Sequence, residues 1–142
     1  MSVSENLEPG LVRNFINLQN KIQKKVGAAL SAHGVGLSEY LVLNQLYVAN
    51  NQNMRRSDLA EQVGLSPSGV TRLLNPMEKM GLIEKQDSPR DARVSLVALS
   101  ETGKKITEEA KVSFEYSSVA LFESLNKNQL STLSELIKVV TK

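Results

Sequence analysis

The sequence predicts a mainly α-helical protein with one short β-hairpin in its second half. Apolar residues recur at helical spacing through most of the 142 residues, and they alternate only around residues 82–99. Glycines, prolines and helix-capping residues separate these runs and so fix the order of the elements. The predicted order is helix, helix, helix–turn–helix, hairpin, helix, helix.

Composition excludes several classes of protein. There is no Cys, which excludes a disulfide framework, a thiolate zinc site and a thiol redox switch. No apolar run approaches the roughly 20 residues that cross a bilayer. Residues 1–10 lack the basic and apolar segments of a secretory signal. We therefore expect a cytoplasmic protein with no membrane partner. The net charge is only +2, so any binding to nucleic acid must follow from charges sorted onto one face.

The first two helices are predicted from apolar periodicity. The first follows Pro9-Gly10 and ends at His33-Gly34. Its apolar stripe comprises Leu11, Phe15, Ile16, Leu18, Ile22, Val26, Ala29 and Leu30. We expect Ser38 to cap the second helix, which ends before a polar turn at 50–53. Its predicted inward residues are Leu41, Val42, Leu46 and Val48.

Capping signals define the helix–turn–helix. Ser57 is predicted to cap the third helix, and Gly64 stands where a left-handed residue ends it. Its predicted buried residues are Leu59, Ala60 and Val63. After the turn at Leu65, Ser66 is predicted to cap the fourth helix, with Pro67 at its first position. Proline is tolerated there because its missing N–H would have no helical partner. Gly81 is predicted to close the fourth helix.

The remaining segments complete a winged module and two terminal helices. Short β-type runs at 82–85 and 93–99 flank a charged tip at 87–92. A long helix is predicted from Ser100-Glu101 to about Ser124. Asn126 and Gln129 resemble a capping pair for a last helix, whose apolar face carries Leu130, Leu133, Leu136, Ile137 and Val140. Residues 54–99 therefore have the outline of a winged helix–turn–helix.

The terminal helices carry more leucine than the winged module needs. Either they form a second core layer within one chain, or both chain ends form a dimer interface, which is the interpretation we favour. We therefore divide the chain into an N-terminal dimerisation helix (1–37), a winged helix–turn–helix region that binds DNA (38–99) and C-terminal dimerisation helices (100–142), within a single domain overall.

The fourth helix has two chemically distinct faces. At about 100° per residue, the predicted buried face contains Val70, Leu73, Leu74 and Met77. The opposite face carries Ser68, Arg72, Asn75 and Lys79, with Thr71 at its edge. Arginine can bond guanine, asparagine can bond adenine, and hydroxyls can bond phosphate. We interpret this face as one that enters the major groove of DNA; the alternative is a merely solvated face.

Pro76 interrupts the hydrogen bonding of this helix. It removes the bond to the Arg72 carbonyl group. Our hypothesis is that a mild bend ends close groove contact after Asn75 and directs Lys79 toward backbone phosphate.

The hairpin tip is a second candidate contact with DNA. Arg90 and Arg93 flank Asp91, so the carboxylate could hold one arginine while the other stays free. A free arginine on a thin tip suits a narrow, electronegative minor groove. The alternative is a solvated turn with a weak surface ion pair.

Two other functions make different demands on the sequence. A winged module that binds a protein partner without DNA would be expected to carry aromatic or Met anchors on this face, and the predicted face has none. An enzyme is not expected, because there is one His, no Cys, no Gly-rich phosphate loop and no clustered carboxylates. We therefore predict no catalytic residue, no metal and no cofactor.

Residues 58–105 resemble the MarR family of bacterial transcriptional regulators. The resemblance is carried by LAE-x-x-G-L-S, TR-L-L, E-x-x-GL-I, a D-x-R wing and L-S-E-x-G. It implies an obligate homodimer with interlaced terminal helices that binds a pseudo-palindromic site in double-stranded DNA, most often as a repressor. The family's thiol-based peroxide sensors cannot be the model, because Cys is absent. Together with the helical pattern, the resemblance predicts DNA contacts from Ser66, Ser68, Thr71, Arg72, Asn75, Lys79, Arg90, Asp91 and Arg93.

Two further expectations come with the resemblance. Most members carry a polar or basic residue where Pro76 stands, so no DNA contact is expected from that position. Many members are released from DNA by small aromatic acids bound between the dimer helices and the winged module. His33, Tyr40 and Tyr47 are candidate contacts for such a ligand; the alternative, which we favour, is a helix cap and core packing.

Overall fold

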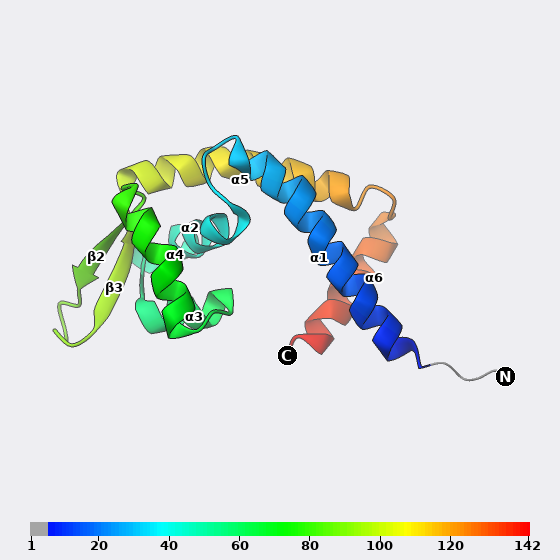
Figure 1. Ribbon diagram of the computed structural model, residues 1–142, viewed down its shortest axis with the longest axis horizontal. Coiled ribbons are helices and arrows are strands. Elements are labelled where there is room, and N and C mark those ends of the chain that lie inside the picture. The colour runs from blue at the N-terminus through cyan, green and yellow to red at the C-terminus, as the bar shows by residue number, and fades with distance from the viewer. Residues whose placement is uncertain (1–5) are drawn as a thin grey trace.

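The computed structural model describes residues 6–142. Residues 1–5 belong to the segment considered for a secretory signal and to the predicted N-terminal unit, and they lie outside the described residues. The elements are α1 (Leu7–Ser31), α2 (Leu37–Val48), the 3-10 turn η1 (Asn50–Gln52), β1 (Asn53–Arg55), α3 (Arg56–Val63), α4 (Pro67–Lys79), β2 (Ile83–Asp87), β3 (Ser95–Leu99), α5 (Glu101–Leu121) and α6 (Lys127–Val140). The mainly α class with a β-hairpin is confirmed (Figure 1).

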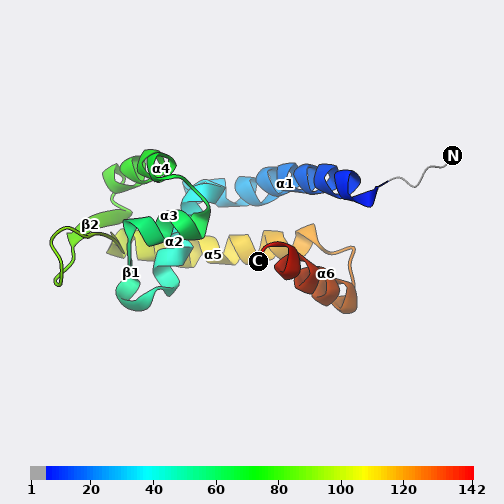
Figure 2. The ribbon, with the colours of Figure 1, turned by 90° about the horizontal axis from the view of Figure 1, so that it is seen from below.

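The elements separate into two ends. The winged module of α2, α3, α4 and the hairpin lies at one end, and the tip of the hairpin extends beyond it (Figures 1 and 2). The N-terminal part of α1, the C-terminal part of α5 and all of α6 lie at the other end. The long helix α5 runs between the two ends and so joins the winged module to the terminal helices.

The sheet contains one strand that the sequence analysis missed. Its order is β1-β3-β2 and both pairings are antiparallel, with Val97 of β3 opposite Met54 of β1 and Lys85 of β2. Residues 50–53 were predicted as a polar turn, but the turn ends at Gln52 and Asn53 begins β1. A three-residue strand is too short to show alternation, and its partner lies far along the chain.

The hydrophobic core is formed mainly inside the winged module. Its fully buried large side chains come from α1, α2, α3, α4 and the hairpin, and they include Leu30, Tyr40, Leu43, Leu46, Leu59, Val70, Leu74, Met77, Leu82 and Val97. Val26 and Leu30 are buried near the end of α1, whereas Leu11, Phe15 and Ile16 are exposed. The predicted stripe of α1 therefore serves the core only in its C-terminal part.

Three predicted helix starts are wrong by one or more residues. α1 begins at Leu7, because Pro9 is tolerated in a first turn whose N–H groups lack helical partners. α2 begins at Leu37, with Gly36 instead of Ser38 as N-cap, since the Glu39 carboxylate accepts the Gly36 N–H at 2.7 Å. α3 begins at Arg56 and places Ser57 inside its first turn, because β1 leads directly into the helix.

The predicted inward face of α2 is half wrong. Val42 and Leu46 are buried, but Leu41 is 41% exposed and Val48 69% exposed. Tyr40 and Leu43 are buried in their place. This helix is apolar on almost every side, so periodicity could not select the face that packs.

Close packing fixes α5 against the base of the wing. The Ser100 N–H donates to the Leu82 carbonyl at 3.1 Å, and its hydroxyl donates to the Gly81 carbonyl at 2.5 Å. Gly103 is buried, and a Cβ there would overlap the Leu82 carbonyl oxygen. The missing side chain thus allows α5 to approach the turn that follows α4. Within residues 6–142, no helix is both long and apolar enough to cross a membrane.

Candidate nucleic-acid interface

The start of α4 is set by local capping, as predicted. The Ser66 Oγ accepts the Gly69 N–H at 3.1 Å, and Pro67 occupies the first helical position. Gly64 adopts φ 70°, a left-handed conformation that an L side chain rarely adopts, and it ends α3. The Leu65 N–H then donates to the Ala60 carbonyl at 2.9 Å. The tight turn between α3 and α4 is therefore fixed by hydrogen bonds at both sides.

The two faces of α4 are arranged as the helical pattern predicts. Val70, Leu74 and Met77 are buried, and Leu73 is half-buried. Four residues of the predicted polar face are exposed, namely Ser68, Arg72, Asn75 and Lys79. We call them the α4 strip. Thr71 lies at its edge and is half-buried. The strip offers two cations, one amide and one hydroxyl, all of which can bond DNA.

Pro76 stands on the exposed side of α4 and does not end the helix. α4 continues through it to Lys79. The Arg72 carbonyl, which loses its helical donor, therefore lies on a helix face that water can reach.

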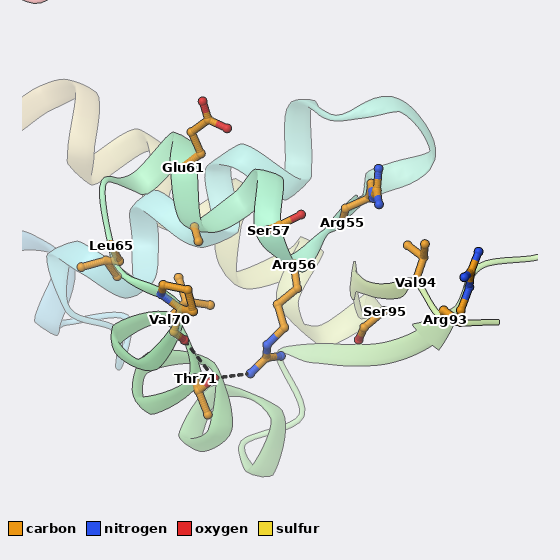
Figure 3. Close-up of a pocket in the computed structure, with 12 residues that line it drawn as sticks. Arg55, Arg56, Ser57, Glu61, Leu65, Val70, Thr71, Arg93, Val94 and Ser95 are labelled. Carbon is orange, nitrogen blue, oxygen red and sulfur yellow. Dashed lines mark hydrogen bonds between the residues drawn. The ribbon is translucent and has the colours of Figure 1, made fainter. Parts of the chain in front are cut away.

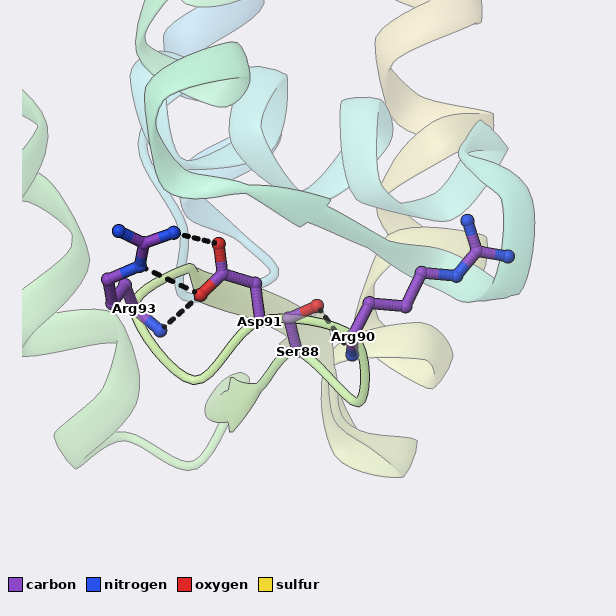
Figure 4. Close-up of polar contacts among 4 residues, drawn as sticks. All are labelled: Ser88, Arg90, Asp91 and Arg93. Atoms are coloured by element: carbon purple, nitrogen blue, oxygen red, sulfur yellow. Dashed lines mark hydrogen bonds and ion pairs between the residues drawn. The ribbon is translucent and has the colours of Figure 1, made fainter.

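The wing tip holds one arginine and leaves another free. Arg93 donates from Nε and Nη2 to the Asp91 carboxylate at 3.2 and 3.3 Å, and its backbone N–H donates at 3.0 Å (Figure 4). These bonds from Arg93 hold the pKa of the Asp91 carboxyl below its usual value. The backbone N–H of Arg90 donates to the Ser88 Oγ at 3.3 Å, while its guanidinium points away from Asp91. The predicted division between a held and a free arginine is confirmed in the structure.

Two arginines beside α4 are not among the predicted contacts. Arg55 and Arg56 line a hollow of about 540 Å³ between α3, α4 and the start of β3 (Figure 3). The Arg56 Nη2 donates to the Thr71 Oγ1 at 3.1 Å. Two consecutive arginines at the start of a helix of the helix–turn–helix are a signal that could have identified them. The prediction of Ser57 as N-cap placed them in a loop instead.

The three candidate ligand contacts each have a partner of their own. The His33 Nε2 lies 2.8 Å from the Ser113 Oγ. The buried Tyr40 ring stacks on Phe114 at 4.7 Å between centroids, and burial raises the pKa of its phenol. The Tyr47 hydroxyl donates to Glu108 at 2.7 Å, a bond that raises the pKa of Tyr47. All three contacts join α2, or the turn that precedes it, to α5.

The acidic groups and the single His are dispersed over the described part of the chain. Among residues 6–142, no three His, Asp or Glu side chains lie close enough together to hold a metal ion.

The fold and the α4 strip define a winged helix–turn–helix protein. Residues 36–95 match the model of the MarR family. The chain is 29% identical over 123 residues to the uncharacterized HTH-type transcriptional regulator YhbI of Bacillus subtilis, covering 86% of this chain and 79% of that relative. It is also 28% identical to the transcriptional repressor MprA of Escherichia coli, over 70% of this chain and 56% of that relative.

A solved structure agrees over nearly the whole chain. A mutant of MarR from Escherichia coli, complexed with operator DNA, superposes with a TM-score of 0.88 at 22% identity, covering 99% of this chain and 100% of that one. The residues that match the family model cover most of the winged module, and the fold shared with the MarR structure includes that module. Residues 36–95 are therefore similar to the MarR family of transcriptional regulators, and the whole chain shares the fold of a solved MarR structure.

Proposed function

We propose that the protein is a homodimeric repressor that binds a pseudo-palindromic operator in double-stranded DNA. The observation that carries this proposal is the α4 strip, an exposed row of DNA-bonding side chains opposite a face on which Val70, Leu74 and Met77 are buried. A helix held this way can enter the major groove without disturbing the core beneath it.

Each candidate contact has a role that follows from its chemistry. Arg72 and Asn75 can bond base edges, because guanidinium and amide groups match guanine and adenine. Lys79 at the end of α4 suits a backbone phosphate, and the hydroxyls of Ser66 and Ser68 can donate to phosphates near the start of the helix. The Ser66 oxygen already caps α4 and lies 3.3 Å from the Ser68 oxygen, so one of these two hydroxyls donates to the other and the second keeps its O–H group available.

The wing completes the proposed interface. Arg90 at the tip is free to enter the minor groove, where the narrow width strengthens the attraction for a cation. Arg93 approaches a phosphate in an orientation that Asp91 fixes through its two side-chain bonds. Asp91 thus acts by orienting Arg93.

The terminal segments supply the proposed dimer interface. Large apolar side chains are exposed on α1, α5 and α6, among them Leu7, Leu11, Val12, Phe15, Ile16, Val112, Val119, Leu136, Val139 and Val140. Burying such a patch against a second copy removes apolar surface from water. We therefore assign dimerisation to 1–37 and 100–142 and DNA binding to 38–99. Two copies would present two α4 strips related by a dyad, as a pseudo-palindromic operator requires.

Two parts of the proposal rest on relatives. Repression is supported by the name of MprA, a transcriptional repressor, and DNA binding by the MarR–operator complex. Release by a small aromatic ligand is the finer part of the proposal: such a ligand would bind where α2 meets α5 and would have to displace the contacts that His33, Tyr40 and Tyr47 make with α5.

Titration with selected DNA at several salt concentrations tests the proposal. Affinity should fall steeply with salt, by about one unit of logarithmic slope for each phosphate contact. Arg72→Ala should relax base preference, and Arg93→Ala should weaken binding nearly uniformly across sequences. Lys24→Ala, on the exposed side of α1, is the matched control and should leave both unchanged. Binding that is indifferent to salt and to both arginine substitutions would refute the proposal.

A further inference from the structure

Arg56 crosses the space between the two helices of the helix–turn–helix. It is the first residue of α3, and its half-buried side chain reaches Thr71 of α4 (Figure 3). Apolar residues form much of the wall of the hollow that it crosses, including Ala60, Leu65, Val70 and Val94. The bond to Thr71 and the walls of the hollow therefore orient the guanidinium of Arg56.

The hydrogen bonds at Thr71 determine what its hydroxyl can still do. A hydroxyl has one proton to donate and two lone pairs to accept. The Thr71 Oγ1 donates its proton to the Pro67 carbonyl at 3.0 Å and accepts from the Arg56 Nη2 at 3.1 Å. One lone pair remains, so in this arrangement Thr71 can accept a hydrogen bond but cannot donate one. Phosphate oxygens, and N7 and O6 of guanine, are acceptors and cannot satisfy it, whereas the amino groups of adenine and cytosine can.

Among the described residues, no carboxylate forms an ion pair with Arg56. Within residues 6–142 the ion pairs are Asp91–Arg93 and Glu135–Lys138, and neither includes Arg56. Arg55 and Arg93 line the same hollow, whose one acidic residue, Glu61, points away from Arg56 (Figure 3). The hollow is bounded by the start of α4 on one side and by the wing on the other. DNA that touches both would pass its backbone across the hollow, where free guanidinium donors can meet a phosphate.

We propose that Arg56 is a positioning residue for DNA recognition: it binds a backbone phosphate and holds Thr71 as an acceptor for the amino group of adenine or cytosine. This inference rests on the proposed function, because it requires α4 to lie in the major groove. It revises the expectation that the hydroxyl of Thr71 bonds phosphate. It also adds to the interface a residue that lies outside α4 and the wing.

Variants at Arg56 separate its two roles. Arg56→Met keeps an unbranched apolar stem and removes all donors and the charge. It should lower affinity about 10-fold, as for a lost hydrogen bond to a charged group, and reduce the salt slope by about one unit. It should also relax the preference for adenine or cytosine at one position in each half-site. Arg56→Lys keeps the charge but lacks the forked guanidinium, so it should restore the salt slope without restoring the base preference.

A double-mutant cycle with Thr71 tests the coupling. Thr71→Val should relax base preference at the same position, and adding Arg56→Met should relax it no further. Arg55→Met is the matched control, because Arg55 lines the same hollow without bonding Thr71, and it should leave base preference unchanged. Thermal melting shows whether each variant folds. If Arg56→Met does not fold, Arg56→Lys tests the proposal by itself: its salt slope should equal that of wild type, and its base preference should be relaxed.

The outcomes distinguish this inference from the function on which it rests. If the wild-type protein enriches no DNA sequence and its affinity for DNA does not depend on salt concentration, the proposed function itself is wrong. If wild type and Arg72→Ala behave as proposed but Arg56→Met keeps the wild-type slope and base preference, only the role of Arg56 is overturned. Equal relaxation by Arg55→Met would also overturn it, since bulk charge would then explain the effect.

Discussion

At the scale of single residues, the wing tip carries two arginines, and the Asp91 carboxylate binds the side chain of one of them, Arg93. Asp91 binds the Arg93 side chain through two bonds, although that side chain is 91% exposed. A surface ion pair of this kind adds little to folding stability, because water screens it. Its consequence is geometric: the bonds to Asp91 orient the Arg93 side chain, whereas the Arg90 guanidinium points away from that carboxylate. We infer that the pair matters for DNA binding more than for folding.

The Asp91 carboxyl should titrate below its usual pKa, because its charged form accepts the bonds from Arg93. A lowered pKa in the folded state means that the pair contributes above the pKa of the unfolded chain. The contribution is lost as pH falls through the lowered value. NMR titration of the carboxyl should show the low pKa in wild type and in Arg90→Gln, and a return toward the ordinary value in Arg93→Gln. The same pKa in all three proteins would show that Arg93 is not its cause.

At the scale of elements, α4 combines a strong start with a weakened second half. Ser66 and Pro67 stabilise its first turn, whereas Pro76 removes a hydrogen bond that would otherwise continue the helix. Only the exposed side is affected, which is the side proposed to meet DNA. The lost hydrogen bond therefore weakens the helix after Asn75, where we propose that close contact with the groove ends.

Pro76→Ala should raise the free energy of unfolding, because it restores the bond to the Arg72 carbonyl. The gain should be at most about 3 kcal/mol, the usual cost of proline inside a helix. The straightened helix should also change operator affinity or base selectivity, since Lys79 would move relative to the backbone. Chemical denaturation and DNA titration measure the two effects. Higher stability with unchanged affinity and selectivity would show that Pro76 has no role in docking.

Features that depend on neighbouring residues could be predicted from the sequence, and those that depend on distant partners could not. The Ser66 cap and the Asn126–Gln129 capping box were predicted because each is complete within four residues. Ser57 was assigned wrongly because β1, which precedes it, forms only by pairing with β3. The bond from Arg56 to Thr71 was missed for the same reason, since it joins two helices across a turn.

At the scale of the whole molecule, the buried core lies mainly in the winged module, whereas most of the exposed large apolar side chains lie on α1, α5 and α6. The winged module has its own core, but the terminal helices expose apolar residues that one chain does not cover; α6 has no buried residue. α5 joins the two ends and is fixed to the winged module at Gly103. A partner copy bound at the terminal helices would therefore set the distance and direction between two α4 strips.

Leu11→Glu should dissociate the dimer, because it places a charge in the apolar patch of α1. Sedimentation analysis should show dimer for wild type and monomer for the variant, with much weaker operator binding. Val48→Glu is the matched control: Val48 is 69% exposed at the end of α2, outside the terminal helices. A wild-type protein that sediments as a monomer would contradict the proposed dimer, and dissociation by Val48→Glu would contradict the assigned surface.

The central claim is that two copies of the α4 strip bind DNA together across a dyad. Selecting bound fragments from random double-stranded DNA, and sequencing them, tests it most directly. The account predicts one enriched site with two-fold symmetry, whose half-sites are centred about one helical turn apart or a multiple of it. Arg72→Ala should weaken the preference for particular bases within each half-site and leave the spacing between the half-sites unchanged. Enrichment of an asymmetric site, or no enrichment at all, would contradict the account.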